Sequence, residues 1–238
     1  MAFTILSQTS KRPRGQNGGS GTATLLIYDV IGAGDWFGDG GTTAKTVATW
    51  LDSLNQPAQL EIRINSPGGD VFEGIAIYNR LANYPVPVDV FVDGAAWSIA
   101  SVIAMAGDTV TLAKNASVMI HNPYAFDMAD ADGKRKIADQ LDAIKVNLID
   151  AYQRHSASGR QRLSDLMDEE TWFTAEQALD IGLATRVEET ALPIAACAPG
   201  FLRYRNMPEW ARPVTAPRPQ FERRAARIAA FLKLTSFK

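Results

Sequence analysis

With 238 residues, 46% of them hydrophobic, the chain can bury one substantial core, and a single large domain is expected rather than two small ones. Its one cysteine, Cys197, excludes an internal disulfide and suits a reducing compartment, while no apolar run approaches the roughly 20 residues of a bilayer span. The net charge of −2 is unevenly spread, because residues 201–238 hold nine Lys or Arg against two Asp or Glu, which leaves the body acidic and the tail basic.

The first part of the chain divides into an arm and the start of a folded body. Residues 1–22, with the run K-R-P-R-G-Q-N-G-G-S-G, contain too little apolar material to pack, so we expect a flexible arm followed by a domain over residues 23–190. An apolar run predicts a strand over Thr24–Ile31. A glycine-rich loop, Gly32–Gly41, follows, and apolar spacing predicts a helix over Thr43–Leu54.

The next segment repeats the alternation of strand and helix. Glu61–Ile64 is a predicted strand, which the turn Ser66–Gly69, reading S-P-G-G, interrupts. A helix is predicted over Val71–Asn83, and the apolar run Val86–Val92 predicts a buried strand that leads into a buried helix over Ile99–Ala106. The apolar residues expected on the buried side of the first of these helices are Phe72, Ile75, Tyr78 and Leu81.

Two short predicted strands, Thr109–Leu112 and Ser117–Ile120, complete a pattern that favours an α/β layered fold. Asp132–Ser158 then predicts one long, highly charged amphipathic helix. Its apolar stripe exposes more surface than a monomer usually leaves bare, so we expect a protruding arm that packs against another subunit of a homo-oligomer. The stripe consists of Ile137, Leu141, Ile144 and Leu148.

The last predicted elements of the domain are short. Leu163–Asp168 is a helical turn and Thr171–Phe173 an extended piece. Thr174 caps a final helix, with glutamine in the capping-box position, and this helix ends at Gly182, a typical C′ residue, before Leu183–Val187.

Residues 191–238 are expected to form a proline-rich, basic extension without regular core structure. Within it, Phe221–Leu234 predicts a short amphipathic helix, which suggests docking on an acidic or grooved partner such as a capsid or scaffold protein. A loose basic tail that keeps the acidic body soluble is the alternative. Nucleic-acid binding is disfavoured, because no aromatic residues interleave with the arginines of that final segment.

Ser98 follows a predicted strand and opens a predicted helix. At such a turn a hydroxyl can face a cleft while the free N–H groups of the new helix point at whatever it attacks, although a serine there can also act only as a helix cap. Of the two histidines, His121 closes a predicted strand beside a loop, where sites usually form. His155, near the end of the charged helix, is typical of a solvated surface histidine.

A nucleophilic serine needs a base, and the oxyanion that it generates needs hydrogen-bond donors fixed in advance. Ser98, His121 and the pair Gly68 and Gly69 can meet these requirements together, because glycines let the backbone approach a bound carbonyl without a side chain in the way. Each signal is weak by itself, since S-P-G-G is also an ordinary turn.

Four motifs in a fixed order resemble the Clp protease proteolytic subunit (ClpP) family: I-N-S-P-G-G, G-A-A-W-S-I-A-S-V-I-A-M-A-G-D, V-M-I-H-N-P and W-F-T-A-E-Q-A-L-D-I-G-L. The resemblance spans about Leu25 to Val187. The runs I-A-S and E-T-W-F-T-A are most similar to the phage- and prophage-encoded branch, whose enzymes resemble capsid-maturation (prohead) proteases. This resemblance implies an α/β, crotonase-like (ClpP-like) fold of repeated β-β-α units with a protruding handle helix that joins two rings. It also implies serine endopeptidase chemistry in a closed chamber, with no cofactor and no metal.

The resemblance implies roles for single residues. Ser98 takes the place of the nucleophile and His121 that of the base, while the backbone amides of Gly69 and Ile99 take the oxyanion-hole positions. The family's aspartate falls where this chain has Glu170.

A glutamate can still orient the imidazole, but its extra methylene requires a different backbone offset. Asp168 and Glu169 are close enough in sequence to compete for this role, and Asp168 is the reserve candidate. Ala100 stands where the family usually carries glycine, a departure that matches the phage branch.

Three functions of other kinds remain open. A crotonase-type acyl-CoA hydratase or isomerase shares the expected fold but uses glutamate acid–base groups. An inactive assembly scaffold has no need of both Ser98 and His121. A Ser-Lys dyad of the signal-peptide-peptidase type would use Lys114 or another lysine together with a membrane anchor, for which the sequence offers no candidate.

The expected partners follow from the resemblance. It implies a ring-forming homo-oligomer, heptameric or of stacked rings, that processes capsid or scaffold proteins; an ATPase-partnered housekeeping-type Clp peptidase is the alternative. The sequence has no Walker motif, so an ATP-driven unfoldase would be a separate protein. We expect no membrane association, and a location in the cytoplasm of a bacterial host or inside a phage procapsid.

Overall fold

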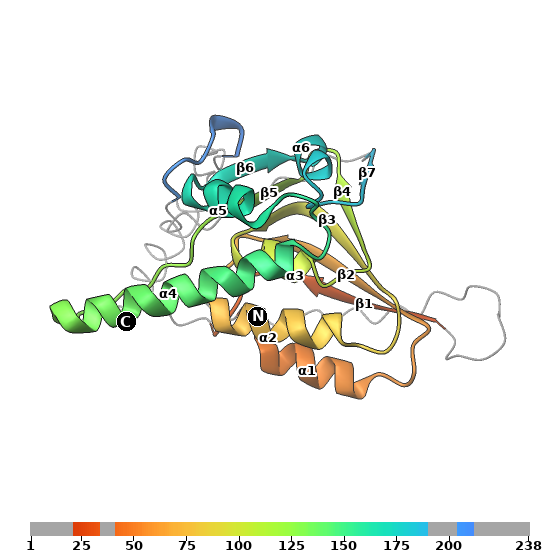
Figure 1. Ribbon diagram of the computed structural model, residues 1–238. Coiled ribbons are helices and arrows are strands. Elements are labelled where there is room, and N and C mark those ends of the chain that lie inside the picture. Colours follow the sequence, from red (N-terminus) through yellow and green to blue (C-terminus); the bar gives the residue numbers. More distant parts are fainter. Residues whose placement is uncertain (1–20, 34–40, 190–203, 212–238) are drawn as a thin grey trace, which may run out of the picture.

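The computed structural model describes residues 21–33, 41–189 and 204–211. In this part of the chain one seven-stranded sheet forms the centre of the molecule, and five strands follow the order β1-β2-β3-β4-β7 (Figure 1). The strands are β1 Thr22–Ile27, β2 Gln59–Ser66, β3 Val88–Trp97, β4 Thr109–Ala113, β5 Ser117–Ile120, β6 Thr171–Thr174 and β7 Arg186–Glu188. The helices are α1 Ala44–Ser53, α2 Val71–Ala82, α3 Ile99–Ala104, α4 Ala131–Tyr152, α5 Arg160–Asp168 and α6 Ala175–Asp180, with a 3₁₀ turn at Glu209–Ala211.

Strand β3 positions the rest of the sheet. Its first half pairs in parallel with β4, from Asp89 to Val92, and its last three residues pair in parallel with β5. Strand β6 then runs antiparallel to β5. Because β3 changes neighbours along its length, its carboxyl end and that of β5 lie side by side, which is where an α/β sheet usually carries its site. The predicted α/β layered fold is confirmed.

Helices α1 and α2 lie together on one side of the sheet (Figure 1). The expected buried face of α2 is partly wrong, because Phe72 is 68% exposed while Ile77 and Leu81 are buried. The face is rotated because Gly74 lies against Ile99 of α3: a Cβ on this glycine would come within 2.1 Å of that isoleucine. The close approach of the two helices therefore decides which side of α2 is buried.

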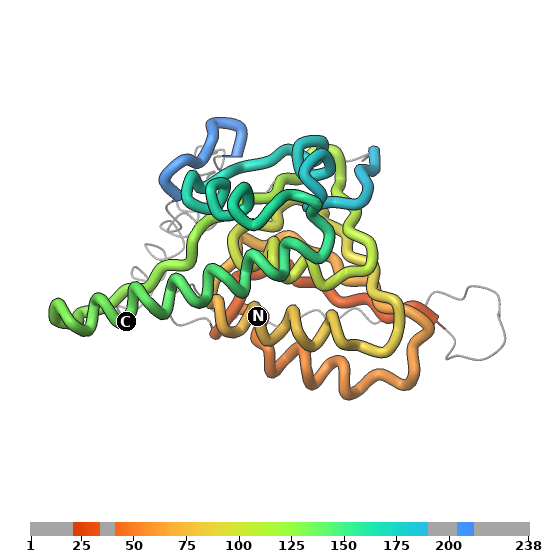
Figure 2. Tube along the Cα trace, in the orientation of Figure 1, coloured from red at the N-terminus to blue at the C-terminus, as the bar shows by residue number. Residues whose placement is uncertain are grey.

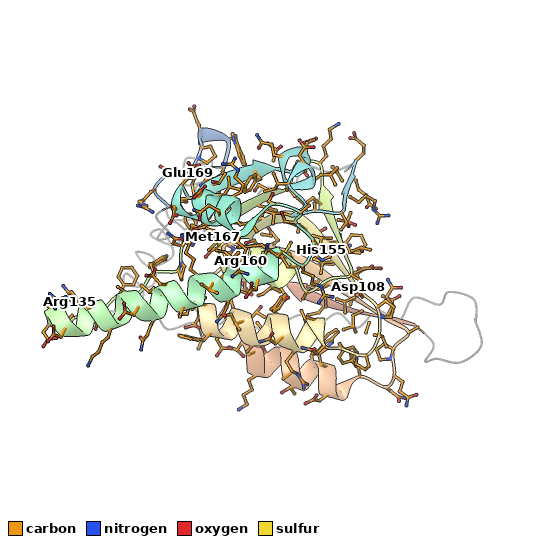
Figure 3. All side chains as sticks on the ribbon, in the orientation of Figure 1. Asp108, Arg135, His155, Arg160, Met167 and Glu169 are labelled. Atoms are coloured by element: carbon orange, nitrogen blue, oxygen red, sulfur yellow. The ribbon has the colours of Figure 1, made fainter. Side chains whose placement is uncertain are left out.

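The long charged helix projects from the body, as Figures 1 and 2 show, but it is shorter than expected. It ends at Tyr152 instead of Ser158. The chain leaves the helix there because the His155 ring bonds the Gly107 carbonyl at 2.8 Å and the Ser156 hydroxyl donates to the Ile181 carbonyl at 2.5 Å. In Figure 3, Arg135 lies near the free end of α4 and His155 lies at its inner end, beside Asp108.

Two local predictions are confirmed. Thr174 forms the predicted capping box of α6, and Gly182 has the positive φ, 79°, of a helix-terminating glycine. Strand β1, by contrast, spans Thr22–Ile27, so it begins before the predicted Thr24 and ends before the predicted Ile31. The predicted N-terminal arm up to residue 20, most of the glycine-rich loop and the predicted helix Phe221–Leu234 lie outside the described residues. None of the helices in the described ranges is long and apolar enough to cross a membrane.

Candidate active site

Ser98 connects β3 to α3 in a strained conformation, with φ 55° and ψ −130°. Such a backbone is costly for a residue other than glycine and is typical of functional sites. The serine occupies the N-cap position of α3 but makes no side-chain cap hydrogen bond, so the interpretation as a simple helix cap is wrong. Its Oγ instead lies 2.7 Å from Nε2 of His121. The backbone conformation at Ser98 therefore directs its hydroxyl toward the His121 imidazole.

The buried hydroxyl groups of Ser101 and Tyr152 stabilise the turn at Ser98. Ser101 Oγ donates to the Ser98 carbonyl at 2.6 Å and lies 2.8 Å from the Tyr152 hydroxyl. The hydroxyl proton of Ser101 is already donated to the Ser98 carbonyl. The Tyr152 O–H is therefore the donor in its contact with Ser101 Oγ. The inner end of α4 is thereby connected to the turn that carries Ser98.

His121 follows β5 directly, and its side chain is partly buried. Burial lowers the pKa of His121 to about 4; the nearby Glu170 carboxylate raises it and the Arg205 guanidinium lowers it further. The imidazole is therefore neutral at pH 7. In the tautomer with its proton on Nδ1, Nε2 accepts the proton of the Ser98 hydroxyl.

The S-P-G-G turn lies directly against the serine. A Cβ on Gly68, where φ is +94°, would come within 2.7 Å of Ser98 Cβ, and a Cβ on Gly69, where φ is +149°, would come within 2.1 Å of the Ile31 carbonyl oxygen. Only glycine fits at both positions. The Ile31 N–H donates to the Gly68 carbonyl, and the Ile31 carbonyl accepts from the Asp70 N–H. Because both neighbours of Gly69 face Ile31 through these bonds, the Gly69 N–H points away from Ile31.

Glu170 is 4% exposed and has a positive φ of 51°, a second strained backbone position in the site. Its carboxylate accepts hydrogen bonds from the backbone N–H groups of Arg205, at 2.9 Å, and Asn206, at 2.6 Å. Among the described residues no hydrogen bond joins it to His121. The carboxylate nevertheless acts to raise the pKa of the imidazole, against the larger lowering that burial causes.

Comparisons with known proteins show the family to which the chain belongs. The Clp protease family model matches residues 41–191, more than half of the chain. The chain belongs to the Clp protease family. It is 31% identical over 139 residues to the ATP-dependent Clp protease proteolytic subunit of Deinococcus radiodurans, covering 58% of this chain and 68% of that relative. The solved structure of a ClpP1 mutant from Listeria monocytogenes has the same fold, with a TM-score of 0.59 and 21% identity, covering 71% of this chain and 92% of that one. Membership of the family makes this protein a peptide-bond hydrolase.

The other candidate side chains of this Clp protease have partners elsewhere. Asp168 accepts hydrogen bonds from Lys145 at 2.8 Å and Asn122 at 2.6 Å, and these donors lower its pKa. It connects α4 to the residue after His121. Lys114, the candidate of the Ser-Lys alternative, forms an exposed ion pair with Glu189 at 2.5 Å.

The sequence did not indicate the 204–211 segment, which lies beside the site of the Clp protease. The Tyr204 ring meets the His121 ring edge-on, with centroids 5.7 Å apart, and its hydroxyl donates to the Pro67 carbonyl. The surrounding prolines favoured an irregular extension. The available signal was the three-residue spacing of Tyr204, Met207 and Trp210, which is typical of a packed turn rather than a solvated tail.

The burial of His121 predicts the pH dependence of this Clp protease. A general base must be neutral, so peptidase activity is expected to be present above the pKa and to fall as the pH drops through about 4, rather than through the ordinary value of 6.5. The measurement is kcat/KM for a small peptide between pH 3.5 and 8, with far-UV circular dichroism at each pH as the control for unfolding. A midpoint near 6.5 in folded protein would contradict the expected burial of the ring.

Proposed function

We propose that this Clp protease is a serine endopeptidase in which Ser98 is the nucleophile, His121 the general base and Glu170 the residue that stabilises the imidazolium. The observation that carries the proposal is the 2.7 Å contact between Ser98 Oγ and His121 Nε2 at a strained strand-to-helix turn. A crotonase-type hydratase has no use for such a pair.

In the proposed reaction Ser98 Oγ attacks the scissile carbonyl carbon while its proton passes to His121 Nε2. The C–N bond breaks when the imidazolium returns this proton to the leaving amine, which leaves an acyl-enzyme that water hydrolyses by the same route. The N–H groups of Gly69 and Ile99 stabilise the oxyanion. The first helical position of Ile99 and the turned-away amide of Gly69 support this assignment, since neither N–H is used in a hydrogen bond between described residues.

For the natural substrate we propose capsid or scaffold proteins cleaved during phage head maturation. This proposal is supported by the runs I-A-S after the serine and E-T-W-F-T-A around Glu170. The name of the Deinococcus radiodurans relative, an ATP-dependent proteolytic subunit, favours a second candidate, a housekeeping peptidase that works with a separate ATPase.

Mass spectrometry of the purified protein separates these candidates. Wild type and a Ser98→Ala variant are incubated with a capsid or scaffold protein, and in parallel with an unfolded model protein, with and without a Clp ATPase and ATP. Cleavage of the capsid protein without ATP supports the first candidate. Cleavage only with the ATPase supports the second. Products that also form with Ser98→Ala would overturn the serine mechanism.

The exposed half of α4 supports the proposal of a homo-oligomer. Leu148 is buried in the core, whereas Ile137 and Leu141 near the free end of α4 are only partly covered by their own chain. Replacing both of these with Asp is expected to dissociate the assembly without unfolding the body, because an interface does not tolerate buried unpaired charges. Ala138→Asp with Ala143→Asp, both at exposed positions, adds the same charge and is the control. Light scattering that shows a wild-type monomer at micromolar concentration would refute the assembly.

A further inference from the structure

The 204–211 segment covers a small apolar cluster beside the site, on a different side of β5 from the main core. Val118 and Ile120 of β5 point into the main core, and Met119 between them points the other way. The second cluster contains Ala95, Trp97, Met119 and Ala211, with Trp172, Tyr204 and Met207 packed against it. Since Trp97 precedes Ser98 and Met119 lies two residues before His121, this cluster supports the ends of both strands that carry the reacting residues.

Tyr204 connects two parts of the site that come from different elements. Its ring contacts His121, with an angle of 86° between the ring planes, and packs on Trp172 with centroids 5.4 Å apart. Its hydroxyl donates to the carbonyl of Pro67, in the turn that presents the Gly69 N–H. Burial raises the pKa of Tyr204, so the phenol keeps its proton at neutral pH and remains a donor.

The next two residues hold the carboxylate of Glu170. One oxygen accepts from the Arg205 N–H and the other from the Asn206 N–H, and Trp172 Nε1 approaches the second oxygen only to 3.4 Å. A buried carboxylate must be hydrogen-bonded or paired to remain ionised. Within the described ranges, the two close donors to Glu170 both belong to the 204–211 segment. Figure 3 shows the neighbouring Glu169 beside this segment, where its carbonyl accepts from the Asn206 side chain at 2.5 Å.

We propose that the 204–211 segment is a positioning element of the active site: Tyr204 fixes the oxyanion turn and the His121 ring, and the N–H groups of Arg205 and Asn206 hold and orient the Glu170 carboxylate. The inference rests on the proposed serine protease function, since it assigns the segment to the same reaction. These contacts act on His121, whose charge changes during the reaction, and on the groups that stabilise the charges formed, and so the segment contributes to kcat more than to KM.

Substitutions at two positions test this role. Tyr204→Ala, which removes ring and hydroxyl, is expected to lower kcat for a small peptide by roughly 10- to 100-fold while KM changes by less than about twofold. Tyr204→Phe, which keeps the ring against His121, should retain an intermediate kcat.

Asn206→Pro removes the backbone N–H that donates to Glu170, whereas Asn206→Ala keeps this N–H. The alanine variant should therefore be at least about tenfold more active than the proline variant. Leu179→Ala is the control, because Leu179 lies on α6, outside the 204–211 segment, and is 40% exposed.

Labelling of Ser98 by a fluorophosphonate probe separates this inference from the proposed function. Wild type labelled at Ser98, with slower labelling and lower kcat in folded Tyr204→Ala and Asn206→Pro, supports the positioning role. Wild-type kcat in either folded variant, or a kcat that rises when the segment is altered, overturns it while the serine mechanism stands. If wild type is not labelled at Ser98, the proposed function fails and the inference fails with it. Thermal melting verifies folding, and should Asn206→Pro fail to fold, the Tyr204 pair decides.

Discussion

Replacing Ser98 with alanine is expected to lower peptidase activity about 10⁴-fold or more, and His121→Ala should lower it by a similar factor. The double variant should lose no more activity than either single variant, because Ser98 Oγ and His121 Nε2, 2.7 Å apart, act as one unit. The activity that remains comes from binding and from oxyanion stabilisation, which neither substitution removes. The measurement is kcat/KM for a small peptide with all four proteins.

The control for this pair is Ser53→Ala, because the Ser53 hydroxyl donates to the Trp50 carbonyl within α1 and has no other hydrogen bond to the described residues. This variant should keep wild-type activity and wild-type labelling by a fluorophosphonate. Labelling that persists in Ser98→Ala, or losses that multiply in the double variant, would show that the nucleophile is a different residue.

Replacing Glu170 with glutamine is expected to give the second large effect, a fall in kcat of up to about 10⁴-fold with the fold retained. The amide keeps the shape of the side chain but removes the charge that raises the pKa of His121 and stabilises the imidazolium. Glutamine also introduces an N–H₂ group opposite the Arg205 and Asn206 N–H groups, so one of these donors loses its acceptor.

Asp168→Asn is the matched comparison, since it makes the same chemical change two residues away. Asp168 binds Asn122 and Lys145, so its substitution should weaken the attachment of α4 and change thermal stability more than kcat. Full activity of Glu170→Gln together with an inactive, folded Asp168→Asn would assign the third role to Asp168.

Much of the fold could be predicted from local pattern. Apolar periodicity and the cap at Thr174 identified most elements to within a few residues, because backbone propensity and capping act over a single turn. The errors occur where distant elements meet. Phe72 is exposed because the contact of Gly74 with α3 rotates α2, and α4 stops at Tyr152 because the following residues bond to Gly107 and Ile181.

The same division holds for the site. The sequence by itself pointed to the proposed reacting pair, Ser98 and His121, and to the glycine turn beside them, because each role needs a particular residue type at a strand end, which a motif records. Only the tertiary structure shows which groups bind the Glu170 carboxylate. It places beside this carboxylate the 204–211 segment, which supplies two of its hydrogen-bond donors. Tyr204 bonds a carbonyl 137 residues earlier in the chain, and its neighbours bond Glu170 through backbone N–H groups. Every residue except proline carries such an N–H group, so this contact has no signature in the order of side chains.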